Sequence, residues 1–187
     1  MGAGVRVLVP LADGCEEIEA VTIVDVLRRA GIEVVVAGVG ATAVTGAHGL
    51  KLTADVTLDT ALQTDFEMVV LPGGEPGATT LRDDARVQAL LKRHAASGKH
   101  VAAICAAPKA LAAAGLLDGR KATSYPGYLD VQPAPGMTFL AQPVVVDGKL
   151  TTSRGPGTAM DFALMLVEQL LGKAKRKAVE DPLMRPG

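Results

Sequence analysis

The sequence has few of the residues that stack on bases, ligate metals or form cross-links. Its 187 residues include no Trp, two Tyr, three Phe, two Cys and three His. So few aromatic side chains leave little material for a base-stacking surface. A net charge of −1, from 19 basic and 20 acidic residues, also lacks the excess of positive charge typical of nucleic-acid binding. We therefore expect no specific nucleic-acid partner.

The same scarcity limits metal and disulfide chemistry. Two Cys and three His are too few for a disulfide framework or a clustered zinc site, and no CxxC or HExxH spacing occurs. We expect no metal and no organic cofactor. The chain shows no basic region followed by a cleavable apolar stretch, and no run of about 18 uncharged apolar residues. These absences predict a cytoplasmic protein without a membrane partner.

What is present is ordinary for a globular protein. Hydrophobic residues make up 49% of the chain and charged residues 21%, which argues against disorder. The length corresponds to one domain over residues 1–187, in which 173–187 is a charged tail or a short helix.

Apolar runs alternate with amphipathic stretches along most of the chain. The runs predict strands at 5–11, 32–39, 66–72 and 101–104, and the stretches predict helices at 16–30, 78–82, 83–97, 107–114 and 158–171. Short edge strands or a hairpin are expected within 40–58, a short strand at 122–125, and a hairpin of 139–146 with 149–153 around Asp147-Gly148. This order predicts an α/β fold, with a mostly parallel sheet covered by helices on both faces.

In such a fold the turns that follow the strands meet at the carboxyl edge of the sheet. Residues 13–16, 73–75, 105 and 154–157 should therefore share one rim. A site assembled from these four turns is the working hypothesis.

Cys105 is the strongest candidate on this rim. It stands between a buried strand and a helix that begins near Pro108, which is the position of a nucleophile elbow. The helix N-terminus is expected to lower the pKa of the thiol. A buried structural Cys in an Ala-rich core is the alternative.

Two further features support a site at Cys105. Gly73 and Gly74 follow the neighbouring strand, where consecutive glycines let backbone N–H groups approach a substrate, although a simple tight turn explains them equally. Glu19 shares a predicted helix face with Ile23 and Leu27, so burial should raise the pKa of its carboxyl. Glu16 is a weaker candidate, because acidic residues are common in the first turn of a helix.

The remaining polar residues of the rim have simpler explanations. Arg154 either binds an anion or braces the loops. Cys15 either resolves an oxidised Cys105 or is a surface thiol. His94 and His100 are expected to be solvated, whereas His48 could reach the rim or a subunit interface.

The motifs Gly14-Cys-Glu-Glu-Ile-Glu19, Leu71-Pro-Gly-Gly74, Ala102-Ala-Ile-Cys-Ala106 and Thr152-Ser-Arg-Gly-Pro-Gly-Thr158 occur in this order. Together they resemble the ThiJ/PfpI family of the class I glutamine amidotransferase-like superfamily, and more closely its parkinsonism-associated deglycase branch. The resemblance covers about residues 5–172. It implies a flavodoxin-like α/β/α sandwich, usually as a homodimer.

The resemblance also implies roles for residues. Cys105 would be the nucleophile, Glu19 the carboxylate that hydrogen-bonds it, and the amides of Gly74 and Ala106, beside Gly73, an oxyanion pocket. The implied activities are glutathione-independent conversion of methylglyoxal to lactate and removal of early glycation adducts. Redox sensing through oxidation of Cys105 and chaperone activity are attributed to the family as well.

The sequence departs from the family at three positions. Tyr125 stands where some members have His, so a Cys–His pair is not expected. Ala106 stands where protease-like members have His, which disfavours a peptidase, and Ala107 replaces a frequent Gly. An amidotransferase or esterase lacks a suitably placed His, whereas the enzyme and the redox sensor use the same residues.

Overall fold

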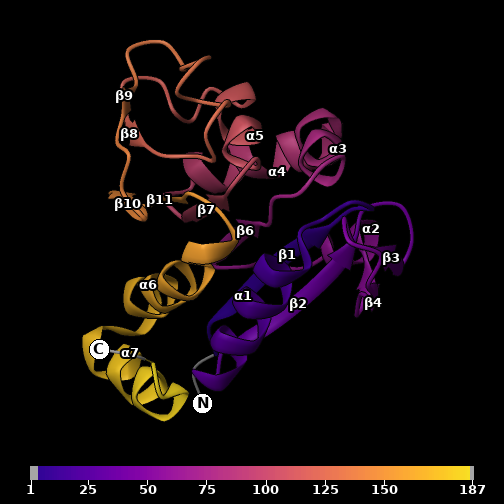
Figure 1. Cartoon of the computed structure of the whole chain (residues 1–187). Helices are drawn as coiled ribbons and strands as arrows, with labels where there is room; N and C mark the ends of the chain where they lie inside the picture. The colour runs from indigo at the N-terminus through magenta and orange to yellow at the C-terminus, as the bar shows by residue number, and fades with distance from the viewer. Residues whose placement is uncertain (1–3, 186–187) are drawn as a thin grey trace.

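A central sheet of seven strands organises the chain (Figure 1). The structure is a computed structural model that describes residues 4–185. The strands follow the order β10-β11-β7-β6-β1-β2-β5, and only the β10–β11 pair is antiparallel. In that order the strands span Val144–Asp147, Leu150–Ser153, His100–Ile104, Met68–Leu71, Arg6–Leu11, Glu33–Gly38 and Val56–Thr57. The predicted α/β fold with a mostly parallel sheet is confirmed.

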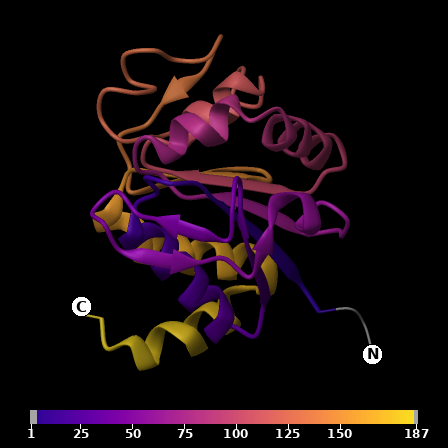
Figure 2. The same cartoon turned by 90° about the vertical axis from the view of Figure 1, so that its right-hand side faces the viewer.

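Helices cover both faces of this sheet (Figure 2), which makes the predicted three-layer α/β/α sandwich. The helices α1 to α7 span Glu17–Arg29, Leu58–Ala61, Gly77–Asp83, Ala85–Ala96, Pro108–Ala113, Ala159–Leu171 and Lys173–Glu180. On one face α1 packs against α6, and α6 packs against α7. On the other face α3, α4 and α5 pack together. Among the described residues, no helix is both long and apolar enough to cross a bilayer.

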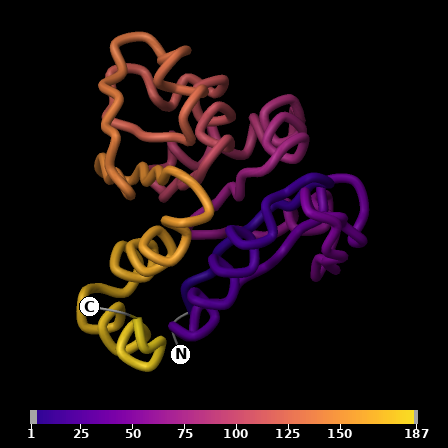
Figure 3. Tube along the Cα trace, viewed as in Figure 1, coloured from indigo at the N-terminus to yellow at the C-terminus, as the bar shows by residue number. Residues whose placement is uncertain are grey.

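Two small sheets lie outside the central one. The hairpin expected within 40–58 is formed by β3, Ala43–Thr45, and β4, Lys51–Thr53. The second pairs β8, Lys121–Ala122, with β9, Thr138–Phe139. Between β8 and β9 the chain makes the long excursion seen as orange tube in Figure 3.

The predicted strands at 122–125 and 139–146 are wrong in extent. The first ends at Ala122, because the chain then turns so that Tyr125 N–H donates to the carbonyl of Cys105 at 2.9 Å. The second is broken into β9 and β10 around Pro143, which has no N–H to continue a ladder and whose carbonyl accepts the Ser153 hydroxyl at 2.7 Å. The hairpin turn at Asp147-Gly148 is confirmed, with Gly148 at a φ of 62°.

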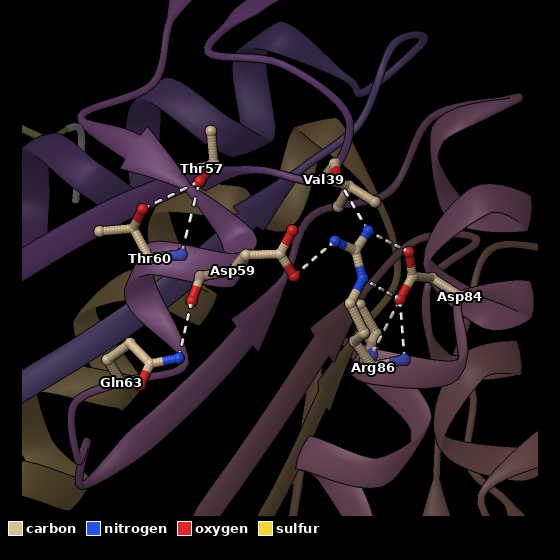
Figure 4. Close-up of polar contacts among 8 residues, drawn as sticks. Val39, Thr57, Asp59, Thr60, Gln63, Asp84 and Arg86 are labelled. Atoms are coloured by element: carbon tan, nitrogen blue, oxygen red, sulfur yellow. Dashed lines mark hydrogen bonds and ion pairs between the residues drawn. The ribbon is translucent and has the colours of Figure 1, made fainter.

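Helix α4 begins one residue later than predicted. Asp84, and not Asp83, caps it, since Asp84 Oδ1 accepts from the N–H groups of Arg86 at 2.8 Å and Val87 at 3.2 Å. Arg86 then turns its guanidinium back to Asp84 Oδ2 at 2.6 Å, to Asp59 of α2 at 2.8 Å and to the carbonyl of Val39 at 2.9 Å (Figure 4). This network ties α2 and α4 to the end of β2.

Three predictions of exposure are also wrong. His94 is 4% exposed and His100 7% exposed, because α4 and β7 turn these rings inward rather than toward solvent. Cys15 is 1% exposed and packs in the core instead of presenting a surface thiol.

Candidate active site

Cys105 lies in the turn between β7 and α5, as an elbow requires. Its φ is 65°, a left-handed conformation that L side chains rarely adopt and that the surrounding structure must hold in place. Two hydrogen bonds do so: Cys105 N–H donates to the carbonyl of Ser153 at 2.9 Å, and the Cys105 carbonyl accepts from Tyr125 N–H at 2.9 Å. The residue is 9% exposed, so the thiol is nearly enclosed.

Glu19 reaches the same turn from α1. It has no exposed surface and shares its buried helix face with Ile23 and Leu27, as predicted. Its Oε2 accepts from the N–H of Gly73 at 2.7 Å, while no hydrogen bond from the protein reaches Oε1 among the described residues. Glu19 Oε2 and Cys105 Cβ both lie against Gly73, since a Cβ added there would come within 2.8 Å and 2.6 Å of them.

The two glycines after β6 allow these groups to meet. A Cβ at Gly73 would lie 2.6 Å from Cβ of Cys105 and 2.8 Å from Oε2 of Glu19. Gly74 has a φ of 85°, and a Cβ there would lie 2.3 Å from the backbone nitrogen of Glu16. The backbone N–H groups of Gly74 and Ala106 lower the pKa of the Cys105 thiol. That the amides of Gly74 and Ala106 form an oxyanion pocket stays a prediction.

Glu19 and Cys105 influence each other's protonation. Burial raises the pKa of the Glu19 carboxyl to about 7, and the charge of Glu16 adds to this rise, while the bonds from Gly73 and Cys105 oppose it. Burial, followed by the negative charge of Glu19 and its hydrogen bond, raises the pKa of the Cys105 thiol to about 12. Since two of these three causes act through Glu19, a proton on the carboxyl removes them, and the pair titrates as one unit.

The expectation that the helix N-terminus lowers the pKa of the Cys105 thiol is therefore corrected. Helix α5 has six residues, too short for a strong dipole, and burial acts in the opposite direction. The groups that do lower the pKa of Cys105 are the individual N–H groups of Gly74 and Ala106.

The other candidates, which directly precede α1, lie beside the glycines. Glu16 is 8% exposed, and its N–H donates to the carbonyl of Gly73 at 2.9 Å. Cys15 packs against Gly77, whose added Cβ would lie 2.8 Å from its backbone nitrogen. Burial, and then the charge of Glu17, raises the pKa of the Cys15 thiol to about 11.

Tyr125 and Arg154 lie on the other side of the elbow. Tyr125 is 48% exposed and its ring covers Gly155, whose added Cβ would lie 3.1 Å from it. Arg154 is half-buried and lines, with Tyr125 and Pro126, a hollow of about 280 Å³. The four turns expected on one rim thus contribute to one region.

The contacts of Glu75 were missed from the sequence, which placed residues 73–75 on the rim without a role for this carboxylate. Glu75, directly after the glycines, accepts hydrogen bonds from Lys109 of α5, from the hydroxyl of Tyr128 at 3.0 Å and from the hydroxyl of Thr79 at 2.8 Å. Lys109 Nζ also lies 5.2 Å from the centre of the Tyr128 ring. The spacing of Lys109, four residues after Cys105, could have predicted that its side chain lies near the site. Nothing in the sequence predicted that Tyr128 lies beside Glu75.

Comparisons with known proteins identify the family of the chain. The model of the DJ-1/PfpI family matches residues 5–169. The chain belongs to the DJ-1/PfpI family. The resemblance drawn from the four sequence motifs is thereby confirmed.

Relatives of the DJ-1 type match over nearly the whole chain. Protein DJ-1 homolog B of Arabidopsis thaliana is 45% identical over 97% of this chain, although the chain spans only 42% of that protein's length. The glutathione-independent glyoxalase DJR-1.2 of Caenorhabditis elegans is 37% identical, with 95% of this chain and 94% of that protein covered.

Solved DJ-1 structures share the fold. Drosophila melanogaster DJ-1beta matches with a TM-score of 0.94 and 40% identity, covering 99% of this chain and 100% of that one. Oxidized Toxoplasma gondii DJ-1 matches with a TM-score of 0.93 and 42% identity, covering 98% and 100%.

Proposed function

We propose that the chain is a cysteine-dependent glyoxalase and deglycase that acts on methylglyoxal or on early glycation adducts. The observation that carries the proposal is the position of Cys105, at a left-handed φ of 65° and beside Gly73, whose N–H donates to the fully buried Glu19. A glutathione-independent glyoxalase among the relatives supports the same reaction class.

In the proposed reaction the sulfur of Cys105 attacks the aldehyde carbon of methylglyoxal. A C–S bond forms, and the oxygen that gains the electron pair is held by the N–H groups of Gly74 and Ala106. The proton shared by Glu19 and Cys105 passes to that oxygen.

Glu19, now a carboxylate, removes the proton from the former aldehyde carbon and returns it to the neighbouring carbon. The hydroxyl proton on the former aldehyde carbon passes to the oxygen of the neighbouring carbon, so that this oxygen becomes a hydroxyl and the former aldehyde carbon becomes the thioester carbonyl. The product is a lactoyl thioester on Cys105. Water then cleaves the C–S bond, which releases lactate and restores the thiol. Methylglyoxal and water have the same atoms as lactic acid, so the sequence needs no outside oxidant or reductant.

Lactate formation in the presence of a chelator tests this proposal. We expect Cys105→Ala to lose turnover by at least about 10³-fold, since it removes the nucleophile. A Tyr125→Phe variant, which changes an exposed residue of the same rim, should keep turnover within a few-fold. Equal rates for the wild type and Cys105→Ala would overturn the thiol mechanism.

A redox sensor is the second candidate function. It is favoured by the enclosure of the thiol between Glu19 and two backbone amides, a setting that can hold an oxidised sulfur. Here peroxide would add two oxygen atoms to Cys105, as seen by mass spectrometry. A protein that gains these oxygens and forms no lactate is a sensor, whereas lactate formation that requires Cys105 supports the enzyme.

We also infer a homodimer. Ile18 and Val21 lie on the solvent side of α1, 58% and 48% exposed, and Leu50, whose N–H donates to Glu17 of the same helix, is 52% exposed. Large apolar side chains gathered in this way are typical of interaction surfaces. Sedimentation analysis should give twice the chain mass for the wild type and a monomer for Val21→Asp, while a wild-type monomer at micromolar concentration would contradict the inference.

A further inference from the structure

Two hollows meet at the amino edge of the central sheet, the edge opposite Cys105. The larger, of about 630 Å³, is lined by residues of β1, β7 and α6, and the smaller, of about 510 Å³, by residues of α4, β10 and β11. Gly98, Lys99 and Lys149 line both, so the two lysines stand where the hollows join. Because His100 begins the five-residue strand β7 and Cys105 follows it, this edge is about 16 Å from the proposed reaction.

Lys149 carries a positive charge that no carboxylate of the described residues balances. It forms no ion pair with Asp or Glu there, and its Nζ lies 2.9 Å from Nε2 of His100 instead. Lys99 has one carboxylate near it, Asp65, whose Oδ1 is 3.9 Å away on a side chain that is 97% exposed. An exposed contact of this length contributes little. Both ammonium groups therefore retain donors for an anion in the hollow.

His100 supplies an independent observation. The residue is 7% exposed and lines the larger hollow. Since an ammonium group can only donate, Nε2 accepts from Lys149, and the neutral ring carries its proton on Nδ1. Burial, and then the charge of Lys149, lowers the pKa of His100, which favours this neutral ring. Among the described residues Nδ1 is buried without a hydrogen-bond partner, so a buried donor lacks its acceptor.

The other polar groups of the larger hollow leave the lysines unpaired. Arg6 is held by Glu33 at 2.9 Å. The charge of Glu67 acts on His100, but within the described part of the chain Glu67 forms no ion pair with either lysine. The half-buried carboxamide of Gln169 makes no hydrogen bond in that part either. Donor groups without an acceptor therefore gather on one wall of the hollow.

We propose that Lys99, Lys149 and His100 bind the phosphate group of a small anion at this edge of the sheet. A phosphate group brings the oxygen acceptors that the two ammonium groups and the Nδ1–H lack, and its charge offsets that of the lysines. The larger hollow has room for the rest of a phosphate monoester, so the group belongs either to such an ester or to free phosphate. No local spacing in the sequence predicts this site, because Lys149 is 49 positions from His100.

Calorimetric titration of the full chain with inorganic phosphate tests the site. In about 0.15 M chloride, which screens general charge effects, we expect one phosphate per chain and at least about tenfold weaker binding to Lys149→Gln. Lys92→Gln removes the same charge from an exposed position of α4 and is the matched control, which should bind as the wild type does. Cys105→Ala should also bind normally, so the result does not depend on the proposed enzyme activity.

A second titration, with glycerol phosphate, identifies the source of the phosphate group. Binding tighter than that of inorganic phosphate assigns the site to a monoester, and weaker binding assigns it to the free ion. Either result supports the site, provided that Lys149→Gln weakens it.

The ring nitrogens of His100 report on the site itself, without any substitution. In proton–nitrogen correlation spectra we expect the Nδ1–H form of His100, and we expect phosphate to shift its signals while those of His48, whose side chain is 75% exposed, stay unchanged. Equal phosphate affinity of Lys149→Gln and the wild type, an equal loss in Lys92→Gln, absence of saturable binding at about 10 mM phosphate, or His100 signals that phosphate leaves in place would each overturn the proposal.

Discussion

The backbone N–H of Gly73 donates a 2.7 Å hydrogen bond to Oε2 of Glu19, a carboxyl group with no exposed surface. This bond joins α1 to the turn after β6 and fixes the plane of the carboxyl. The second oxygen, Oε1, accepts no hydrogen bond from a described donor. Glu19 is therefore oriented by one oxygen, and its carboxyl lies close enough to Cys105 for each group to shift the pKa of the other.

The first prediction concerns stability and pH at Glu19. Its pKa is about 7 in the folded chain, against an ordinary value of 4.5, so the folded chain binds this proton more tightly. The resulting stability is complete below pH 4.5, is lost as the pH rises through 7, and amounts to at most about 3 kcal/mol. Glu19→Gln should lack this loss in urea unfolding between pH 5 and 8.

Glu33→Gln makes the same change on a side chain that is 58% exposed, and it is the control. It should follow the wild-type dependence on pH. If Glu19→Gln and the wild type decline in parallel, the raised pKa of Glu19 is refuted.

The second prediction concerns space between the glycines and the thiol. Gly73→Ala places a Cβ 2.6 Å from Cβ of Cys105, so the turn must shift. We expect the free energy of unfolding to fall by about 1–3 kcal/mol, as in other overpacked sites, and turnover of methylglyoxal to be lost. Gly157→Ala lies on the same rim, where an added Cβ meets nothing within 4 Å, and should change neither quantity. Full activity of Gly73→Ala would contradict the arrangement.

The third prediction concerns Tyr128, one of only two tyrosines in the chain. Burial, and then the hydrogen bond to Glu75, raises the pKa of its phenol to about 12. In a Tyr125→Phe background, ultraviolet absorbance reports Tyr128 alone. We expect less than half of it to be ionised at pH 11, and Glu75→Gln to move the titration to lower pH. An unchanged titration after Glu75→Gln would show that the Glu75 carboxylate does not raise the pKa of the Tyr128 phenol.

The fourth prediction concerns the start of α4. Asp84→Ala removes the cap and one partner of Arg86, and should lower the free energy of unfolding by about 1–2 kcal/mol. Arg86 chiefly holds the pKa of Asp84 below its ordinary value of 3.8, so this contribution is present above pH 3.8 and is lost as the pH falls further. Urea unfolding at pH 7 and pH 3 measures both effects.

Asp83→Ala is the matched control for the cap. The Asp83 side chain is 59% exposed and pairs only with Arg82 in the described part of the chain. We expect its loss to cost less than about 0.5 kcal/mol. If Asp83→Ala lowers the free energy of unfolding more than Asp84→Ala does, then Asp83, and not Asp84, caps α4.

The spacing of apolar residues predicted the fold, because apolar side chains recur where a strand or helix faces the core. The apolar runs became the buried strands β1, β2, β6 and β7, and their order fixed a parallel sheet. The predictions failed where tertiary contacts override local pattern. Pro143 interrupts an apolar run, and His94 lies on a helix face that its sequence neighbours make polar but that packing makes buried.

The site was predictable as far as its residues follow strand ends. Cys105, Gly73 and Glu19 were placed together by topology and by one helix face. The Glu75–Lys109–Tyr128 contacts and the position of His48 depend on how long loops fold back, which no local spacing records. The pKa of the thiol was misjudged for the same reason, since it depends on enclosure and not on the adjacent helix alone.

The left-handed backbone of Cys105 implies that thermal stability and the reactive thiol place opposite demands on this position. Holding a side-chain-bearing residue at a φ of 65° stores about 1–2 kcal/mol of conformational energy. A glycine at this position relieves that energy and removes the reactive sulfur, so selection for thermal resistance alone favours loss of the nucleophile. In variants of this chain selected for thermal stability, the presence of Cys105 should accordingly be checked before the increase in stability is attributed to better packing.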